Sequence, residues 1–293
     1  MPEGVEVYVV AEKAHALLAG AKIRSIEVLM PKKCPGLQEL EAELQHSQSE
    51  GNDLVIEACH SRGKKVLFNL SDKTWLAFAF LMTGRLAWQP EGEELAESDL
   101  KHIKLTMELE LEDGSSGWLH YCDPRGLGNA TWIQDVASFE DYFKKVGPDL
   151  MRDSISLEQY KKVIQGKRIA NKQVADFLMS QQYFAGVGNY LKAEILFTCR
   201  LHPASPLKLL TDEMIERLYE ATLDTMAESL SYGGLTIHDF WGLSGERGTF
   251  PVKVYGQKTV EVDGITYKVE TSEFKDKRTT HWVPALQLMP WPQ

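Results

Sequence analysis

Short strand-like runs fill the first half of the chain and restrict its fold more than any other feature. From residue 21 to residue 132 the chain shows eight β-rich runs, among them KIRSIEVLM, KKVLFNL and IKLTMELEL. Turn-forming stretches such as PKKCPG, EDGSSG and DPRGLG separate these runs. Many short strands at this spacing are typical of an antiparallel sandwich or barrel.

The pattern becomes helical after residue 150. Four segments there have the helical spacing of apolar residues, and Thr211 is a candidate N-cap for the last of them. Helices are also expected over residues 6–18 and within 136–155. After residue 250 the runs KTVEV and ITYKV flank Asp263-Gly264, a two-residue hairpin turn. The four helical segments are SLEQYKKVIQG, NKQVADFLMSQ, NYLKAEILFTC and TDEMIERLYEATLDTMAESLS.

These changes of pattern predict a mixed α+β chain in several parts. An antiparallel β-sandwich with flanking helices covers residues 1–135, and a linker containing Gly147 and Pro148 covers 136–150. A helical domain follows over 151–249, and a β-hairpin segment completes the chain over 250–293.

The net charge of -10 disfavours nucleic-acid binding, but the charge is unevenly distributed. Residues 38–57 hold six acidic and no basic side chains, and residues 91–113 hold nine acidic side chains against two lysines. Residues 151–202 instead hold eight basic side chains against four acidic ones. The composition is therefore compatible with a DNA-binding face opposite an acidic one.

Hydropathy and cysteine spacing bear on the cellular setting. No apolar run approaches the ~20 residues of a membrane span, and the N-terminus lacks a signal-peptide pattern. The four cysteines are far apart and form no CxxC pair. We therefore expect an intracellular protein, nuclear or cytoplasmic depending on the organism, without a disulfide framework or a zinc–thiolate site.

The first six residues, MPEGVE, place a proline and two carboxylates at the very start of the chain. Removal of the initiator methionine would leave Pro2 with a free secondary amine. An α-amino group titrates near pH ~8, so a useful fraction of it is nucleophilic at neutral pH. An ordinary frayed terminus is the alternative interpretation.

The segment QQYFAGVGNYLKAEIL joins two predicted helices through a loop with Gly186 and Gly188. Glycines before a helix let backbone N–H groups approach a phosphate, and Asn189 could cap the helix or bind the phosphate itself. A tight turn between packed helices explains the same glycines. Lys172, one helix earlier, is either a further phosphate ligand or a solvated lysine.

Three more motifs adjoin strands. RGKK opens a strand with Lys64, which could meet a phosphate or an abasic sugar, or could simply be solvated. MTGRL and DPRGLG are loops that carry apolar or Arg side chains beside glycine. Enzymes that extract a base from duplex DNA must fill the vacated stack, and Met, Leu and Arg suit that purpose. Tight turns with buried Met82 and Leu127 are the alternative.

Together these motifs resemble the formamidopyrimidine-DNA glycosylase/endonuclease VIII family. MPEGVE, SRGKK, MTGRL, DPRGLG, QQYFAGVGNYLKAEIL, YGGLTIHDF and VYGQK occur in the family's order and approximate spacing, over essentially the whole chain. The resemblance implies a bifunctional DNA glycosylase/AP lyase of base excision repair that excises oxidised bases through an N-terminal proline Schiff base. The strand would then be cleaved by β/δ-elimination. DNA would lie in the cleft between a catalytic β-sandwich and a helix–two-turns–helix domain, kinked, with the damaged nucleotide everted.

The resemblance also implies roles for individual residues. Pro2 would attack the sugar C1′ and form an imine, and Glu3 would move protons at the opening sugar. Lys64 is the third residue expected in the catalytic set, where it would hold a phosphate, and Glu6 would line the base pocket. The other expected DNA contacts are Lys172, Asn189 and Arg278 at phosphates, with Met82, Arg125 and Leu127 in the vacated stack.

The chain departs from the family pattern at several positions. Val5 replaces the usual proline after MPEG, and Leu127 stands where many members have an aromatic wedge. Family members often end in a four-cysteine zinc finger, and no tetrahedral thiolate site can be built here. The resemblance therefore implies a zinc-less β-hairpin finger without a metal or other cofactor. The positions that correspond to the cysteines are Val260, Asp263, Val283 and Leu286.

Damaged DNA, in duplex or also single-stranded form, is the expected partner of a monomeric protein that does not contact membranes. The lesion preference stays open, because MPEG, RGK and GNYLKAEIL look closest to endonuclease VIII-like members and YGGLTIHDF more like the formamidopyrimidine branch. A non-catalytic damaged-DNA-binding protein on the same scaffold is the alternative function. The intact Pro2, Glu3 and Lys64 argue against it. A generic phosphate-binding helical module is a more distant alternative.

Overall fold

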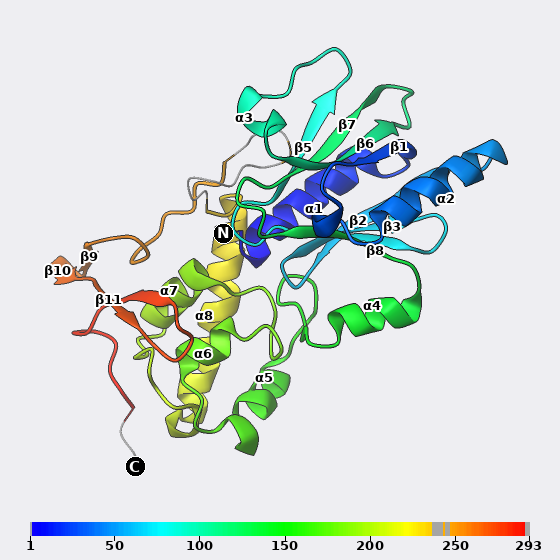
Figure 1. Cartoon of the computed structure of the whole chain (residues 1–293). Coiled ribbons are helices and arrows are strands. Elements are labelled where there is room, and N and C mark those ends of the chain that lie inside the picture. The colour runs from blue at the N-terminus through cyan, green and yellow to red at the C-terminus, as the bar shows by residue number, and fades with distance from the viewer. Residues whose placement is uncertain (1, 236–242, 244–246, 291–293) are drawn as a thin grey trace. The chain divides into compact units, whose positions relative to one another are not determined.

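A computed structural model describes residues 2–235, 243 and 247–290 of the chain (Figure 1). By its contacts the chain divides into two compact units, Met1–Lys144 with Gly233–Thr249, and Lys145–Tyr232 with Phe250–Gln293. The described residues among 233–249, which fall at the end of the predicted helical domain, thus belong to the first unit. None of the helices in the described part of the chain combines the length and the apolar character that a membrane span requires.

The first unit contains an antiparallel sheet, as the β-rich runs predict. Its eight strands have the spatial order β5-β7-β6-β1-β2-β3-β4-β8. Every pairing between neighbouring strands is antiparallel. The strands are β1 (Lys22–Val28), β2 (Leu54–Arg62), β3 (Lys65–Leu70), β4 (Trp75–Ala79), β5 (Arg85–Pro90), β6 (Ile103–Glu110), β7 (Ser116–Cys122) and β8 (Asn129–Ile133).

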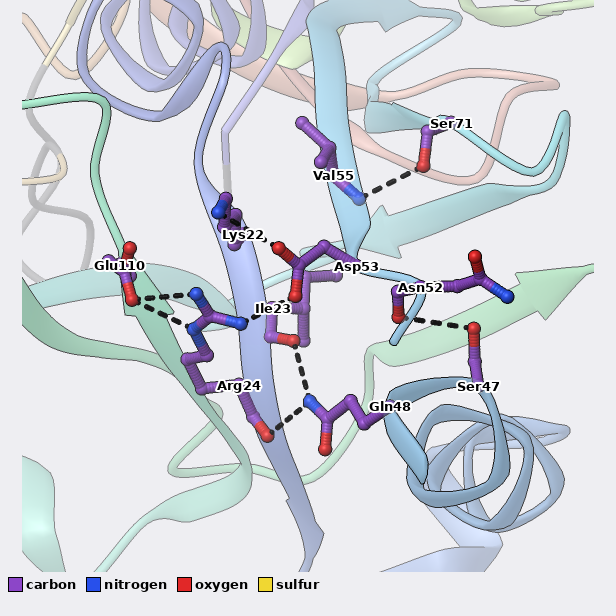
Figure 2. A network of polar contacts seen from close by, with 10 residues as sticks. All are labelled: Lys22, Ile23, Arg24, Ser47, Gln48, Asn52, Asp53, Val55, Ser71 and Glu110. Carbon is purple, nitrogen blue, oxygen red and sulfur yellow. Dashed lines mark hydrogen bonds and ion pairs between the residues drawn. The ribbon is translucent and has the colours of Figure 1, made fainter. Parts of the chain in front are cut away.

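The sheet bends at β1, where its two halves join. β1 pairs with β2 at Lys22 and Ile23, and its pairing with β6 shifts register between Ile23 and Ser25. Gln48 satisfies the carbonyl groups beside this irregularity, because its Nε2 donates to Ile23 O at 3.3 Å and to Arg24 O at 2.9 Å. Figure 2 shows this amide between the helix that carries Gln48 and β1. The corner is thus held by a side chain of the adjacent helix.

Charged side chains fasten the same corner from outside the core. Arg24 pairs with Asp53 at 2.6 Å and with Glu110 at 2.8 Å, and Lys22 pairs with Asp53 at 2.9 Å (Figure 2). Their hydrogen bonds raise the pKa of Arg24 and lower the pKa of Asp53. These pairs are partly exposed, so we expect each to contribute little to stability by itself.

The two halves of the sheet share one apolar core, which gives the predicted sandwich. The rings of Phe78 on β4 and Tyr121 on β7 lie 5.9 Å apart, and Tyr121 Oη donates to Ala79 O at 3.3 Å. Buried side chains of both halves and of two helices join the same cluster. These helices are α1 (Gly4–Leu18) and α2 (Leu37–Ser49); the unit also holds α3 (Glu97–Leu100), α4 (Val136–Phe143) and the 3-10 turn η1 (Pro31–Lys33).

Helix α1 begins at Gly4, so the predicted start at residue 6 is wrong by two residues. Glu3 is the N-cap residue, and Glu6 reaches back to it in a capping box. Gly20, at φ +83°, follows the end of the helix.

The second unit consists of helices and a short finger of strands. Its helical segments match the four predicted ones, and Thr211 accepts a hydrogen bond from the N–H of Met214 at 3.3 Å, which confirms the N-cap. The long α8 packs against α5 and α7 (Figure 1). The bounds are α5 (Leu157–Ile164), α6 (Val174–Met179), α7 (Asn189–Thr198) and α8 (Asp212–Ser231), with 3-10 turns η2 (Lys167–Ile169) and η3 (Leu207–Leu209).

The finger consists of two antiparallel hairpins, β9 (Thr259–Val262) with β10 (Ile265–Lys268), and β11 (Glu270–Glu273) with β12 (Thr279–Trp282). Asp263 and Gly264 form the first turn at φ +52° and +75°, which confirms the predicted two-residue turn. Three of the positions that correspond to zinc-binding cysteines instead pack in an apolar cluster with α7. They are Val260, Val283 and Leu286.

Candidate active site

The first residues of the chain form the capped start of α1. Pro2 is buried, and Glu3 is 1% exposed. The backbone N–H of Glu3 donates a hydrogen bond to Glu6 Oε2 at 2.7 Å. The N-terminal proline and the carboxylate beside it are therefore positioned by a helix, which argues against a frayed terminus.

Glu6 accepts a backbone hydrogen bond on each carboxylate oxygen. Besides the N–H of Glu3 on Oε2, the N–H of Leu235 donates to Oε1 at 2.7 Å. Gly234 lies at φ +85°, and a Cβ there would be 2.5 Å from Glu6 Oε1, so this approach requires glycine. Glu6 thus ties the start of α1 to residues 233–235. The remainder of YGGLTIHDF, residues 236–240, lies outside the described residues.

Lys64 occupies the tip of the β2–β3 hairpin. Arg62 pairs with Lys65, and the intervening Gly63 and Lys64 have φ values of +53° and +64°, as a tight two-residue turn requires. Arg62 Cζ and Lys65 Nζ lie 4.8 and 5.3 Å from the ring centre of Phe143 on α4. Burial lowers the pKa of Lys65. The base of the hairpin is therefore braced by α4, with Lys64 at its turn.

A buried carboxylate joins the loops at residues 80–84 and 123–128. Asp123 is 0% exposed; its Oδ1 accepts from Thr83 Oγ1 at 2.6 Å and its Oδ2 from the N–H of Gly128 at 2.7 Å. The two loops are therefore joined through one buried side chain. The alternative of two turns with buried apolar tips is wrong for Leu127. The predicted void-filling residues lie on these loops, Met82 half-buried and Arg125 and Leu127 exposed.

Lys172 lies just before α6 in the second unit. Its ammonium pairs with Asp176 at 2.6 Å and lies 5.8 Å from the ring centre of Tyr183. Both side chains of the pair are about a quarter exposed or less, at 21% and 25%. Lys172 is thus held by the helix that follows it, and its contact with a phosphate stays a prediction.

The loop between α6 and α7 is built around Gln181. Its Nε2 donates to Met179 O at 3.0 Å and to Val187 O at 2.9 Å, while its Oε1 accepts from the N–H of Gly186 at 3.1 Å. The N-cap of α7 is Gly188, which makes no side-chain cap, so the prediction that Asn189 could cap this helix is wrong. Asn189 Nδ2 instead donates to Thr279 O at 3.0 Å, next to the finger arginine.

Arg278 is exposed on the finger, and its backbone is anchored on both sides. Its N–H donates to Asp276 Oδ1 at 3.3 Å, and Thr280 Oγ1 donates to its carbonyl oxygen at 3.4 Å. Asp276 Oδ2 in turn accepts from Lys192 of α7 at 2.5 Å. The finger arginine is therefore fixed to the same helix as Asn189.

The cysteines and acidic residues do not form a metal centre in the described part of the chain. No group of three or more His, Cys, Asp or Glu side chains there is placed to hold a metal ion. All four cysteines are buried, and burial raises the pKa of Cys34 and of Cys122 to about 11. These thiols are protonated at neutral pH and are poor nucleophiles.

Comparison with known proteins places this geometry in a family. Residues 1–130 match the formamidopyrimidine-DNA glycosylase N-terminal domain, and residues 146–240 match the formamidopyrimidine-DNA glycosylase H2TH domain. The chain is 30% identical to the formamidopyrimidine-DNA glycosylase of Listeria innocua over 98% of its own length and 100% of that protein. The chain belongs to the formamidopyrimidine-DNA glycosylase family. The enzyme of that name from Streptococcus pneumoniae is 29% identical over 98% of this chain and 99% of its own.

Solved structures of the formamidopyrimidine-DNA glycosylase from Lactococcus lactis have the same fold. A mutant bound to THF-containing DNA superposes with a TM-score of 0.82 at 25% identity, over 98% of this chain and 99% of that one. An inhibited form bound to DNA with N7-benzyl-Fapy-dG superposes with a TM-score of 0.81 at 26% identity and the same coverage.

Within this formamidopyrimidine-DNA glycosylase scaffold, several residues that position the site escape analysis of the sequence. Except for Gln181, which binds Met179, Gly186 and Val187 nearby, each has a partner that is remote in the chain, so local residue spacing does not predict these contacts. Asp123 lies within the DPRGLG motif, where an acid at the base of a glycine loop is a local signal. Gln181, Lys192 and Leu235 also lie within quoted motifs, but their residue types do not indicate their partners. The others are Gln181, Lys192 and Asp276, together with Leu235, whose N–H binds Glu6.

Proposed function

We propose that the chain is a base-excision-repair DNA glycosylase with AP lyase activity that acts on damaged DNA. One observation carries the assignment of the reacting group: Pro2 and Glu3 sit at the capped start of α1, with Glu3 1% exposed. A non-catalytic DNA-binding protein has no need for an ordered secondary amine beside a buried carboxyl group.

The N-terminal amine of Pro2 attacks C1′ of the damaged nucleotide. The C1′–N bond to the base breaks, and the base leaves with the bonding pair and takes up the proton that the attacking amine loses. Glu3 donates a proton to the ring oxygen as the sugar opens, which leaves an iminium between Pro2 and C1′. Splitting one difficult displacement into these steps is the benefit of covalent catalysis.

Strand cleavage follows from the iminium. Because the iminium withdraws electrons from C1′, the C2′ proton becomes acidic, and the Glu3 carboxylate removes it. The electron pair moves to form the C2′–C3′ double bond, and the 3′ phosphate leaves. A second elimination releases the 5′ phosphate, and hydrolysis of the imine restores Pro2.

The cationic side chains hold the DNA for this chemistry. Lys64 at the hairpin tip and Arg278 on the finger are proposed phosphate ligands, together with Lys172 and Asn189. Arg278 suits bidentate contact with a phosphate because its guanidinium is planar. Glu6 serves the base pocket indirectly, by holding residues 233–235 against α1.

Borohydride trapping tests the proposal directly. We expect the protein to form a covalent adduct with duplex DNA that contains a single abasic site or oxidised base. Peptide mapping should assign the adduct to Pro2. An N-terminal tag should abolish the adduct, while the same tag at the C-terminus should leave it unchanged. Binding without any adduct would indicate the non-catalytic alternative, and an adduct that survives the N-terminal tag would exclude Pro2.

A further inference from the structure

Leu81 combines two locally unfavourable features at the edge of the proposed DNA-binding surface. Its φ is +48°, in the left-handed region, and its side chain is 52% exposed. Of the described non-glycine residues at positive φ, Leu81 alone carries an aliphatic side chain; the others are Lys64, Lys73, Arg200, Asp263 and Lys277. A branched apolar residue in this conformation is uncommon, and such residues concentrate at functional sites.

The loop that carries Leu81 is fixed in place. The N–H of Gly84 donates to Phe80 O at 2.8 Å, which closes a tight turn over Leu81 and Met82. Thr83 in this turn binds the buried Asp123, and the N–H of Arg125 donates back to Thr83 Oγ1 at 3.2 Å. Because the turn is braced, the exposure of Leu81 is a property of the folded loop.

The neighbouring loop presents an equivalent apolar side chain. Strands β4 and β8 pair at Ala79 and Asn129, so the two loops leave adjacent strand ends. Leu127, on the second loop, is 45% exposed, and Arg125 beside it is exposed. Two aliphatic side chains and a guanidinium therefore stand on one braced surface. The apolar tips and the planar guanidinium all suit contact with stacked bases.

We propose that Leu81 is a fourth void-filling side chain, which enters the duplex beside the everted nucleotide together with Met82, Arg125 and Leu127. This inference rests on the proposed function. Leu81 then buries in the base stack the surface that it exposes in the free protein.

The test replaces Leu81 by glycine, which removes the side chain and relieves the backbone. If Leu81 fills the duplex, Leu81→Gly should keep or raise the melting temperature. Its borohydride trapping on an abasic duplex should nevertheless fall about tenfold, because apolar contact with the stack is lost. Trapping on the same strand without its complement should be unchanged, since no stack has to be filled. Leu81→Met should restore most of the duplex activity.

Lys73→Gly is the matched control, because Lys73 also has a positive φ, at +68°, in the turn between β3 and β4. This substitution relieves the same kind of backbone strain and should leave trapping unchanged on both the duplex and the single strand. Equal loss on duplex and single strand, or full duplex activity in Leu81→Gly, would overturn the role of Leu81. Failure of the unchanged protein to trap any DNA would instead count against the proposed function itself.

Discussion

Lys192 and Asp276 form a buried ion pair that joins α7 to the finger. Lys192 Nζ and Asp276 Oδ2 lie 2.5 Å apart, and the two side chains are 0% and 1% exposed. The other oxygen of Asp276 accepts from the N–H of Arg278. One carboxylate therefore connects a helix of the DNA-binding domain to the backbone of the proposed phosphate-binding arginine.

Breaking this pair should loosen the finger. Lys192→Met leaves a buried carboxylate without its cation, so we expect a loss of about 3–5 kcal/mol in the free energy of unfolding. Denaturant unfolding measures the loss, and hydrogen exchange should localise it to residues 274–282. Lys268→Met, which removes an exposed pair with Glu270, is the control and should cost less than about 1 kcal/mol. Equal effects of the two variants would contradict the role of the buried pair.

Glu6 should be a stabilising residue as well as a neighbour of the reactive terminus. In Glu6→Gln one carboxylate oxygen becomes an NH₂ group that faces a backbone N–H, so we expect a loss of about 2 kcal/mol in stability. The amide of Leu235 should exchange faster with solvent, which hydrogen exchange can detect. Glu43→Gln on the exposed face of α2 is the control, and its unfolding should match that of the unchanged protein.

Asp123 should couple the two loops of the proposed void-filling surface. Asp123→Asn can still accept one hydrogen bond, but its amide NH₂ cannot accept the second, and we expect a loss of about 2 kcal/mol in stability. Because the loops separate, binding to duplex DNA with an abasic site should weaken by more than binding to the single strand. Fluorescence anisotropy on both substrates measures the difference. A uniform decrease would show that Asp123 acts on overall stability alone.

His120 should make the first unit sensitive to acid. The ring is 6% exposed between Gln89 Oε1 and Thr106 Oγ1, each at 2.9 Å, and burial lowers its pKa. The unfolded chain therefore takes up a proton before the folded one. Stability is fully present above pH ~6.5 and is lost as the pH falls toward the folded pKa, by at most about 1.4 kcal/mol per pH unit.

Melting temperatures between pH 7.5 and 5 test this dependence. His120→Gln should flatten the acid side of the profile relative to the unchanged protein, and replacement of the exposed His46 should not. Comparing the three proteins with one another removes the contribution of the carboxylates and the remaining histidines, because these groups titrate in every variant.

Local signals account for the parts of the fold that the sequence predicts. The Asp263-Gly264 turn was predictable because two residues at positive φ select those side chains, and the helix at 212–231 because Thr211 caps it. The sequence pattern places the start of α1 two residues too late, because glutamate is an unusual N-cap and Glu6 therefore resembles an ordinary residue of the helix interior.

The contacts that the sequence does not predict join residues that are far apart in the chain. Asp123 binds Thr83 across 40 residues and Lys192 binds Asp276 across 84, so both contacts depend on the completed fold. The strain at Leu81 is equally hidden, because nothing in MTGRL or its neighbours requires a left-handed residue before Met82. The motifs therefore name the side chains that would touch DNA, while the residues that hold them in place emerge from the structure.

Val260, Val283 and Leu286 pack against α7 with apolar side chains, which offer no ligand to a metal. A finger held by thiolates unfolds when chelators or oxidants remove its zinc. Here the finger that carries Arg278 is held by hydrophobic contacts and by the Lys192–Asp276 pair, and neither reagent removes these. An enzyme built this way would keep its hold on damaged DNA under the oxidative conditions that produce the damage.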